Sequence, residues 1–182
     1  MSKWKTHKEK WSNCTLCELC ETRNKVVLFK GKIPCEILFV GEAPGKSENM
    51  LGKPFMGPAG HLLDQMVTKA GLDDYRRGYT NLVSCIPLDI DGEKLSDPDK
   101  EHIKACDDRL TEMIQMCKPK YLVAVGKLAH KFLVDKRKKL KPGHYTTITH
   151  PGAILRADIT QKGIQVQRAV ATLRDLIDDV PF

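Results

Sequence analysis

Residues 37–57 read ILFVGEAPGKSENMLGKPFMG, in which an apolar segment ends directly in a turn rich in glycine and proline. The apolar run 36–41 predicts a buried β-strand. The turn looks like a nucleotide-binding P-loop, but the spacing is wrong: the position that must be glycine or alanine, five before Gly45, is Val40. Pro44 also lacks a backbone N–H group that a phosphate would use. The spacing therefore disfavours a P-loop, and a nucleotide hydrolase stays only as a minor alternative.

The segments on either side of this turn alternate between strand and helix patterns. The predicted strands are 36–41, 78–84, 121–126 and 145–149, and the predicted helices are 59–70, 99–117, 127–134 and 161–178. Such alternation is typical of parallel strands with helices on both faces, so the sequence predicts a three-layer α/β fold. The length of 182 residues suits a single domain over residues 1–182.

Three unusual loops follow the ends of the predicted strands. In sheets of parallel strands, ligands bind beyond the carboxyl ends of the strands. We therefore expect the polar and aromatic residues of these loops to gather at one edge of the sheet. The loops are 42–57, 81–87 and 150–156, and the residues are Glu42, Phe55, Asn81 and His150.

The composition indicates a globular protein without a membrane span. The chain is 41% hydrophobic and 29% charged, and no apolar run approaches the length needed to cross a bilayer. The first residues are polar and basic rather than apolar, so we expect no secretory signal and an intracellular, cytoplasmic protein. The net charge of +7 favours polyanionic partners without requiring them. The basic run from Lys136 to Lys139, with Lys141, is either a solvated loop or a phosphate-contacting cluster.

The cysteines suggest a metal centre. The chain has seven, and an odd number in a reducing compartment argues against a disulfide framework. Cys14 and Cys17 form a C-x-x-C pair, which can hold a metal from one turn of chain, and Cys20 extends the run. Cys85 and Cys106 are candidates for a second pair, although the helical pattern around Cys106 also allows a core residue. Zinc and a [4Fe–4S] cluster both accept four thiolates, so composition leaves both open.

Five motifs together resemble the iron–sulfur uracil-DNA glycosylases, family four of the uracil-DNA glycosylase superfamily. They occur in the family's order, cover most of residues 14–156, and read CTLCELCETRNKVV, ILFVGEAPGKSENMLGKPFMGPAGHLLDQM, YTNLVSCIP, KPKYLVAVGKLA and THPGAILR. Each motif is weak alone, but the set is highly specific. The resemblance implies a central four-stranded parallel sheet flanked by helices. It also implies a structural [4Fe–4S] cluster held by Cys14, Cys17, Cys85 and Cys106, with the position of Cys20 not a ligand.

The resemblance further implies roles for the residues at the strand ends. Phe55 would stack on an everted uracil, and Asn81 would read the uracil edge with one donor and one acceptor. His150 would hydrogen-bond uracil O2 and stabilise the leaving anion, while Glu42 would position water or favour the cationic sugar. Without the resemblance, Asn81 would be interpreted as a turn residue at a strand end and His150 as a structural or exposed residue, while a core position is the alternative for Phe55. The other implied contacts are Gly41 and Ala43 to uracil, Leu155 and Arg156 in the minor groove, and Lys46, Ser47 and Arg156 at phosphates.

The activity implied by the resemblance is hydrolysis of the N-glycosidic bond of deoxyuridine in DNA, which releases uracil and leaves an abasic site for base-excision repair. We expect a monofunctional, monomeric enzyme at the nucleoid whose partner is uracil-containing DNA, with repair or replication proteins as further candidate partners. The alternative is a non-catalytic or altered-specificity DNA-binding relative that keeps the fold and the cluster. Covalent trapping of DNA is not expected, because residues 86–102 contain no Arg-Arg-Ile-His segment.

The chain departs from the family pattern in three places. His-Pro-Gly at 150–152 replaces the usual His-Pro-Ser, and because glycine has no hydroxyl for a phosphate, we expect weaker DNA affinity. Glu48-Asn49 stands where the family usually has Glu-Asp. The loop after Cys85 is longer and more acidic than usual, so we expect it to repel DNA locally or to contact a protein partner. Its acidic residues are Asp89, Asp91, Glu93, Asp97 and Asp99.

Overall fold

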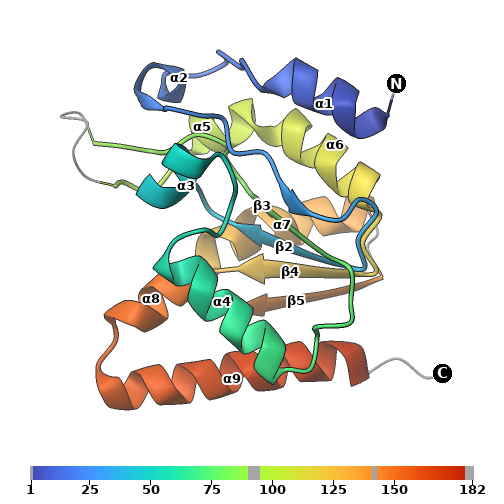
Figure 1. Cartoon of the computed structure of the whole chain (residues 1–182), viewed down its shortest axis with the longest axis vertical. Helices are drawn as coiled ribbons and strands as arrows, with labels where there is room; N and C mark the ends of the chain where they lie inside the picture. The colour runs from blue at the N-terminus through green and yellow to red at the C-terminus, as the bar shows by residue number, and fades with distance from the viewer. Residues whose placement is uncertain (1, 90–94, 141–142, 179–182) are drawn as a thin grey trace.

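The chain folds into a central sheet with helices on both faces (Figure 1). The structure is a computed structural model, and it describes residues 2–89, 95–140 and 143–178. Within these residues the sheet has five strands in the order β1-β3-β2-β4-β5. Strands β3, β2, β4 and β5 are parallel, and the short β1 is antiparallel to β3. The predicted three-layer fold with four parallel strands is thus confirmed, and β1 adds an antiparallel edge. The strands are β1 (Lys30–Gly31), β2 (Ile37–Gly41), β3 (Arg77–Asn81), β4 (Tyr121–Val125) and β5 (His144–Ile148).

Both faces of the sheet are buried, which explains the continuous apolar runs. Side chains alternate along β2, so that Ile37 and Phe39 enter one hydrophobic cluster and Leu38 and Val40 enter the other. The first cluster is covered by α4 (Pro58–Lys69), α8 (Pro151–Arg156) and α9 (Ile159–Asp178) (Figure 1). The second is covered by α5 (Lys100–Ala105), α6 (Asp107–Cys117) and α7 (Lys127–Leu140). The N-terminal α1 (Lys3–Trp11) packs on the outside of α6.

The structure differs from the predicted elements at three places that matter for the site. The predicted helix 99–117 is divided at Cys106, where α5 ends and α6 begins. The predicted strand 78–84 leaves the sheet after Asn81. Two of the predicted loops contain short helices, namely α3 (Lys46–Leu51) after β2 and α8 after β5. Periodicity could not locate the break at Cys106, because apolar residues continue at helical spacing on both sides of it.

The turn after β2 is held closed by the buried carboxylate of Glu48. One of its oxygens accepts hydrogen bonds from the backbone N–H groups of Met56 and Gly57, both at 2.8 Å, and the other accepts from Gly45 N–H at 3.0 Å. Gly45 N–H, which a phosphate-binding loop would use, is therefore already occupied. The adjacent Asn49 accepts the backbone N–H of Asn24 at 2.8 Å, so the Glu48-Asn49 pair joins the turn to the N-terminal segment.

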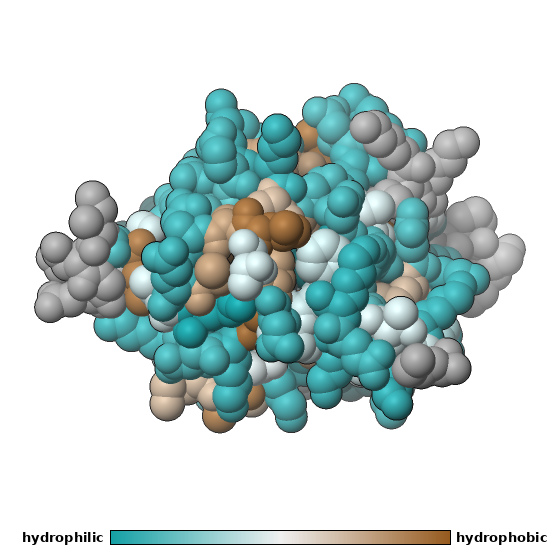
Figure 2. Space-filling model, turned by 90° about the horizontal axis from the view of Figure 1, so that it is seen from above, coloured by the Kyte–Doolittle hydropathy of each residue, from teal (hydrophilic) through white to brown (hydrophobic). Residues whose placement is uncertain are grey.

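The outer surface on the side of α1 is mainly hydrophilic, with a small hydrophobic area near its centre (Figure 2).

Across the described ranges, no helix has both the length and the apolar character needed to span a bilayer.

Gly60 allows the unusual backbone that presents Phe55. Phe55 has a left-handed φ of 55°, which is uncommon for a residue other than glycine. A Cβ atom on Gly60 would lie 2.2 Å from the carbonyl oxygen of Phe55 and 2.7 Å from its Cα. The start of α4 and the Phe55 turn can therefore approach each other only because residue 60 has no side chain.

We predict that Gly60→Ala lowers the free energy of unfolding by about 1–3 kcal/mol, because the turn must shift to admit the methyl group. Urea denaturation measures this change. The matched control is Gly163→Ala in α9, where nothing lies within 4 Å of the added methyl group. It should raise the free energy of unfolding by about 0.5–1 kcal/mol through helix propensity. Equal stability of Gly60→Ala and wild type would contradict this account of the turn.

Candidate active site

The loops after β2, β3 and β5 form one cleft at the carboxyl edge of the sheet. The arrowheads of β2 and β4 point to the side on which α3 and α8 lie (Figure 1). The cleft has a volume of about 860 Å³, within the range of small-molecule sites. Glu42, Phe55, Asn81 and His150 all line it. The structure thus brings together the four residues that the sequence analysis expected at one edge of the sheet.

Because Gly41 has no side chain, the Phe55 ring and the Asn81 amide can both lie close to its Cα. Gly41 and Asn81 are register partners at the ends of the parallel strands β2 and β3. A Cβ atom on Gly41 would lie 2.5 Å from Asn81 Oδ1 and 2.7 Å from Cζ of Phe55. Gly41 therefore acts as a spacer behind the cleft rather than as a lining residue. The Phe55 ring is 7% exposed and lies 5.8 Å from the Tyr79 ring, so it is held more deeply than a freely presented ring.

Gly126 similarly allows Glu42 and His150 to lie next to each other. This glycine follows β4 and has a left-handed φ of 102°. A Cβ atom there would lie 2.8 Å from Glu42 Oε1 and 3.0 Å from Cβ of His150. Gly126 was not among the predicted site residues, although its signal was present: a glycine at the end of a buried strand, like Gly41.

The imidazole of His150 is held in one tautomer. Its Nδ1 accepts the backbone N–H of Gly152 at 3.0 Å, so the proton of the neutral ring is on Nε2, which can donate a hydrogen bond. Burial, and secondarily the Arg156 guanidinium, lowers the pKa of His150. The ring is therefore a neutral donor near pH 7. A Cβ atom on Gly152 would lie 3.1 Å from Nδ1, so glycine in the His-Pro-Gly sequence suits this close contact.

Three carboxylates line the cleft, those of Glu42, Glu48 and Asp97, and the one of Glu48 is bound by backbone N–H groups of the turn after β2. Burial, and then the charge of Asp97, raises the pKa of Glu42, whereas Arg156 opposes the rise. Asp97 also lines the cleft. One acidic residue of the loop after Cys85 thus lies at the cleft, and the expectation that this loop repels DNA or contacts a protein partner stays a prediction. Asp99 instead caps α5 by accepting His102 N–H at 2.8 Å. Asp91 and Glu93 lie outside the described residues.

The remaining predicted contacts, Ala43 to uracil and the others to DNA, divide into two groups. Arg156 and Ala43 line the cleft, and so does Lys127, which was not predicted. Lys46 and Leu155 lie outside the cleft with exposed side chains, and Ser47 is half-buried at the start of α3.

The basic run in α7 is partly engaged within the protein. Lys136 forms an ion pair with Asp107 at 2.6 Å and donates to the hydroxyl of Thr111 at 2.7 Å. This lysine is therefore already engaged by groups of α6. Lys138 is exposed beside Asp135, and Lys141 lies outside the described residues.

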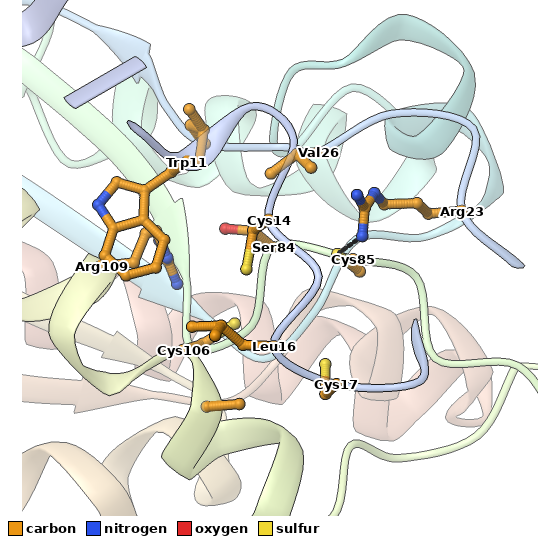
Figure 3. A pocket seen from close by; sticks show the side chains of 12 residues that line it. Trp11, Cys14, Leu16, Cys17, Arg23, Val26, Ser84, Cys85, Cys106 and Arg109 are labelled. Atoms are coloured by element: carbon orange, nitrogen blue, oxygen red, sulfur yellow. Dashed lines mark hydrogen bonds between the residues drawn. The ribbon is translucent and has the colours of Figure 1, made fainter. Parts of the chain in front are cut away.

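Four cysteines from three distant segments surround one small cavity (Figure 3). Cys14 and Cys17 come from the segment after α1, Cys85 follows β3, and Cys106 stands between α5 and α6. Cys20 does not line this cavity. Burial raises the pKa of Cys17, and it raises the pKa of Cys85 to about 11. Deprotonation of these thiols is therefore unfavourable without a partner, and a bound cation would stabilise the thiolates.

The surroundings of the cavity suit an anionic metal–thiolate group. Arg23 donates to the Cys85 sulfur at 3.5 Å. Ser84 Oγ and Arg109 Nε are buried without a hydrogen-bond partner among the described residues, and both residues line the cavity. Four sulfur ligands with nearby donors form the kind of set that holds zinc or an iron–sulfur cluster.

Comparison with known proteins gives the family. The sequence profile of the uracil DNA glycosylase superfamily matches residues 29–174. The chain belongs to this superfamily. The cleft therefore lies within the part of the chain that the uracil DNA glycosylase superfamily shares, whereas Cys14 and Cys17 precede it.

Curated type-4 uracil-DNA glycosylases are similar to this member of the superfamily. The protein of Sulfurisphaera tokodaii is 37% identical over 130 residues, which cover 71% of this chain and 57% of that protein. The protein of Archaeoglobus fulgidus is 35% identical over 123 residues, which cover 68% and 59%. The chain thus spans somewhat more than half the length of these relatives. The crystal structure of Pedobacter heparinus SMUG2 shares the fold, with a TM-score of 0.64 at 14% identity over 79% of this chain and 76% of that chain.

The raised pKa of Glu42 predicts a pH-dependent gain in stability for Glu42→Gln. Because the folded-state pKa lies above the ordinary 4.5, ionised Glu42 destabilises the fold at neutral pH, and the protonated side chain does not. We expect the variant to have a higher Tm than wild type at pH 7 and an equal Tm below pH 4.5. Thermal unfolding across this range measures the difference. The exposed Glu9→Gln in α1 is the control and should match wild type throughout; a Tm gain for Glu42→Gln that persists at low pH would contradict the explanation.

Proposed function

We propose that this chain is a type-4, iron–sulfur uracil-DNA glycosylase. In this proposal it hydrolyses the bond between C1′ of deoxyribose and N1 of uracil in DNA, releasing uracil and leaving an abasic site. The observation that carries the proposal is the meeting of a neutral imidazole donor, an amide and an aromatic ring in one cleft of a uracil DNA glycosylase superfamily member. Similarity to curated type-4 enzymes supports the same substrate.

Uracil would stack on the Phe55 ring and hydrogen-bond to the Asn81 amide. The base must first leave the stack, because its reacting bond is inaccessible in the duplex. The Phe55 ring offers a flat apolar face, and the Asn81 amide offers one donor and one acceptor to the O4 and N3–H groups. Both groups lie close to Gly41, where no side chain separates them. Backbone groups of the turn at Ala43 complete the base site.

His150 would stabilise the departing base. As the C1′–N1 bond breaks, its electron pair moves onto uracil and charge builds on O2. A neutral Nε2–H donor can bond to that oxygen more strongly in the transition state than in the ground state. The hydrogen bond from Gly152 N–H to Nδ1 keeps the proton on the nitrogen that needs it.

Glu42 would act on the sugar side of the bond. The cleaved sugar carries positive charge, and a water molecule must add to C1′ and lose a proton to give the abasic hydroxyl. A carboxylate next to His150 can hold that water and stabilise the cation. Outside the base site, Arg156 and Leu155 would contact the minor groove, and Lys46 and Ser47 would contact phosphates.

Cys14, Cys17, Cys85 and Cys106 would hold a [4Fe–4S] cluster within the same domain. The cluster supplies a structural cross-link rather than a reactant, because its four ligands join the N-terminal segment to the chain after β3 and to the start of α6.

We expect His150→Ala and Asn81→Ala each to lower the rate of uracil release by about 100- to 1,000-fold, since each removes a donor from the base site. Single-turnover release from a uracil-containing oligonucleotide measures the rate. His130→Ala is the control, because His130 bonds to Tyr145 at 2.9 Å and does not line the cleft. Wild-type rates in both site variants would refute the roles proposed for them. DNA binding by the wild type without any release would instead favour the non-catalytic alternative.

Anaerobically purified protein should be brown with broad visible absorbance, and Cys85→Ser should lose colour and iron. The matched control, Cys20→Ser, should keep both, because Cys20 does not line the four-cysteine cavity. Iron, sulfide and zinc analysis measures the content. A colourless wild type with stoichiometric zinc would replace the cluster by a zinc site and leave the catalytic proposal to the release assay.

A further inference from the structure

Arg109 is a buried cation placed between the cysteine centre and the base site. It lies in the first turn of α6, three residues after Cys106, and is 1% exposed. Its Nη1 donates to the hydroxyl of Thr80 at 3.0 Å. Its Nη2 donates to the carbonyl oxygens of Asn81 and Leu82 at 2.6 and 2.7 Å. The guanidinium therefore holds the carbonyl groups of the two consecutive peptide bonds that follow Asn81 and Leu82.

The charge of Arg109 has no carboxylate partner among the described residues. A buried charge is costly unless an opposite charge compensates it. Arg109 lines the four-cysteine cavity, its Nε has no hydrogen-bond partner, and it interacts electrostatically with Cys106, Cys85 and Cys14. A metal–thiolate group in that cavity is anionic overall, so it supplies the missing countercharge.

We propose that Arg109 is a positioning residue that couples the metal–thiolate centre to Asn81, the residue that reads the base. The anionic centre fixes the guanidinium, and the guanidinium fixes the carbonyl groups that set the direction of the Asn81 side chain. This inference rests on the proposed function, because it takes the cavity as a loaded centre and Asn81 as a base contact.

The backbone around Asn81 is held from two opposite sides. On one side, Leu82 N–H donates to Gly41 O at 2.9 Å and Val83 N–H donates to Glu42 O at 3.1 Å. On the other side, Arg109 binds the carbonyl groups. Removing the guanidinium leaves the two buried carbonyl oxygens of Asn81 and Leu82 without this donor, while the links to β2 remain. The amide contact across Gly41 then loses its fixed geometry.

The test compares Arg109→Met and Arg109→Lys with wild type in the full chain, purified anaerobically with its centre loaded. In Arg109→Met, we expect faster amide hydrogen exchange at residues 80–83. Uracil release should have a kcat/KM lower by about 10- to 100-fold, as for other residues that support metal sites. The cluster should have a more negative reduction potential, because a nearby positive charge favours the more reduced, more anionic cluster. Arg109→Lys should restore the potential but only part of the exchange protection, since it keeps the charge and loses the two-pronged donor.

Arg23→Met is the matched control, because Arg23 bonds to the Cys85 sulfur but makes no bond to the Asn81 backbone. It should shift the potential and leave exchange at 80–83 unchanged. Wild-type exchange at 80–83 in Arg109→Met would overturn the proposal, and so would equal loosening of this segment in Arg23→Met. If Arg109→Met does not fold, Arg109→Lys decides, since full wild-type protection there would also overturn the proposal. A wild type that releases no uracil would refute the proposed function, while exchange and potential would still decide whether Arg109 couples the two sites.

Discussion

The register of the parallel strands is the constraint on which the site depends. Pairing of β2 with β3 sets Gly41 opposite Asn81. Pairing of β2 with β4 sets Val40 opposite Ala124, so Gly126, two residues later, lies at the same edge. A shift of one residue would turn the Asn81 side chain to the other face of the sheet. Because both faces are packed with apolar side chains, such a shift would also bury polar groups, and the hydrophobic core therefore fixes the geometry of the cleft.

Two glycines convert this register into close contacts between functional groups. Because Gly41 has no side chain, the Asn81 amide and the Phe55 ring can both approach its backbone. Gly126 gives the same access to the Glu42 carboxylate and the His150 side chain. Gly41 ends β2 and Gly126 directly follows β4, and every residue of these two strands is buried. The cleft thus depends on glycines at the strand ends, where the absence of a side chain leaves room for its lining residues. Packing holds these residues in place in the unliganded protein.

Much of the fold followed from periodicity, because buried strands and amphipathic helices have distinct apolar spacings. The four parallel strands and the position of Glu42, Phe55, Asn81 and His150 at one edge could be predicted in this way. The break at Cys106 could not, because apolar residues continue at helical spacing on both sides of it. The inward return of Asp97 was equally hidden, since an acidic residue in a polar loop has the same composition whether it faces solvent or a cleft. Contacts that depend on one long polar side chain, such as those of Glu48 and Arg109, have no periodic signature at all.

The packing of α1 on α6 has a consequence for the order in which the protein is made. His7 and Trp11 both hydrogen-bond to Glu112, at 2.9 and 2.8 Å, so the first helix finds its partner only after most of the chain has been synthesised. Cys14 and Cys17 must likewise wait for Cys85 and Cys106. The nascent chain therefore leaves the ribosome with its amino-terminal thiols unpartnered, and the four-cysteine cavity can form only after Cys106 has been made.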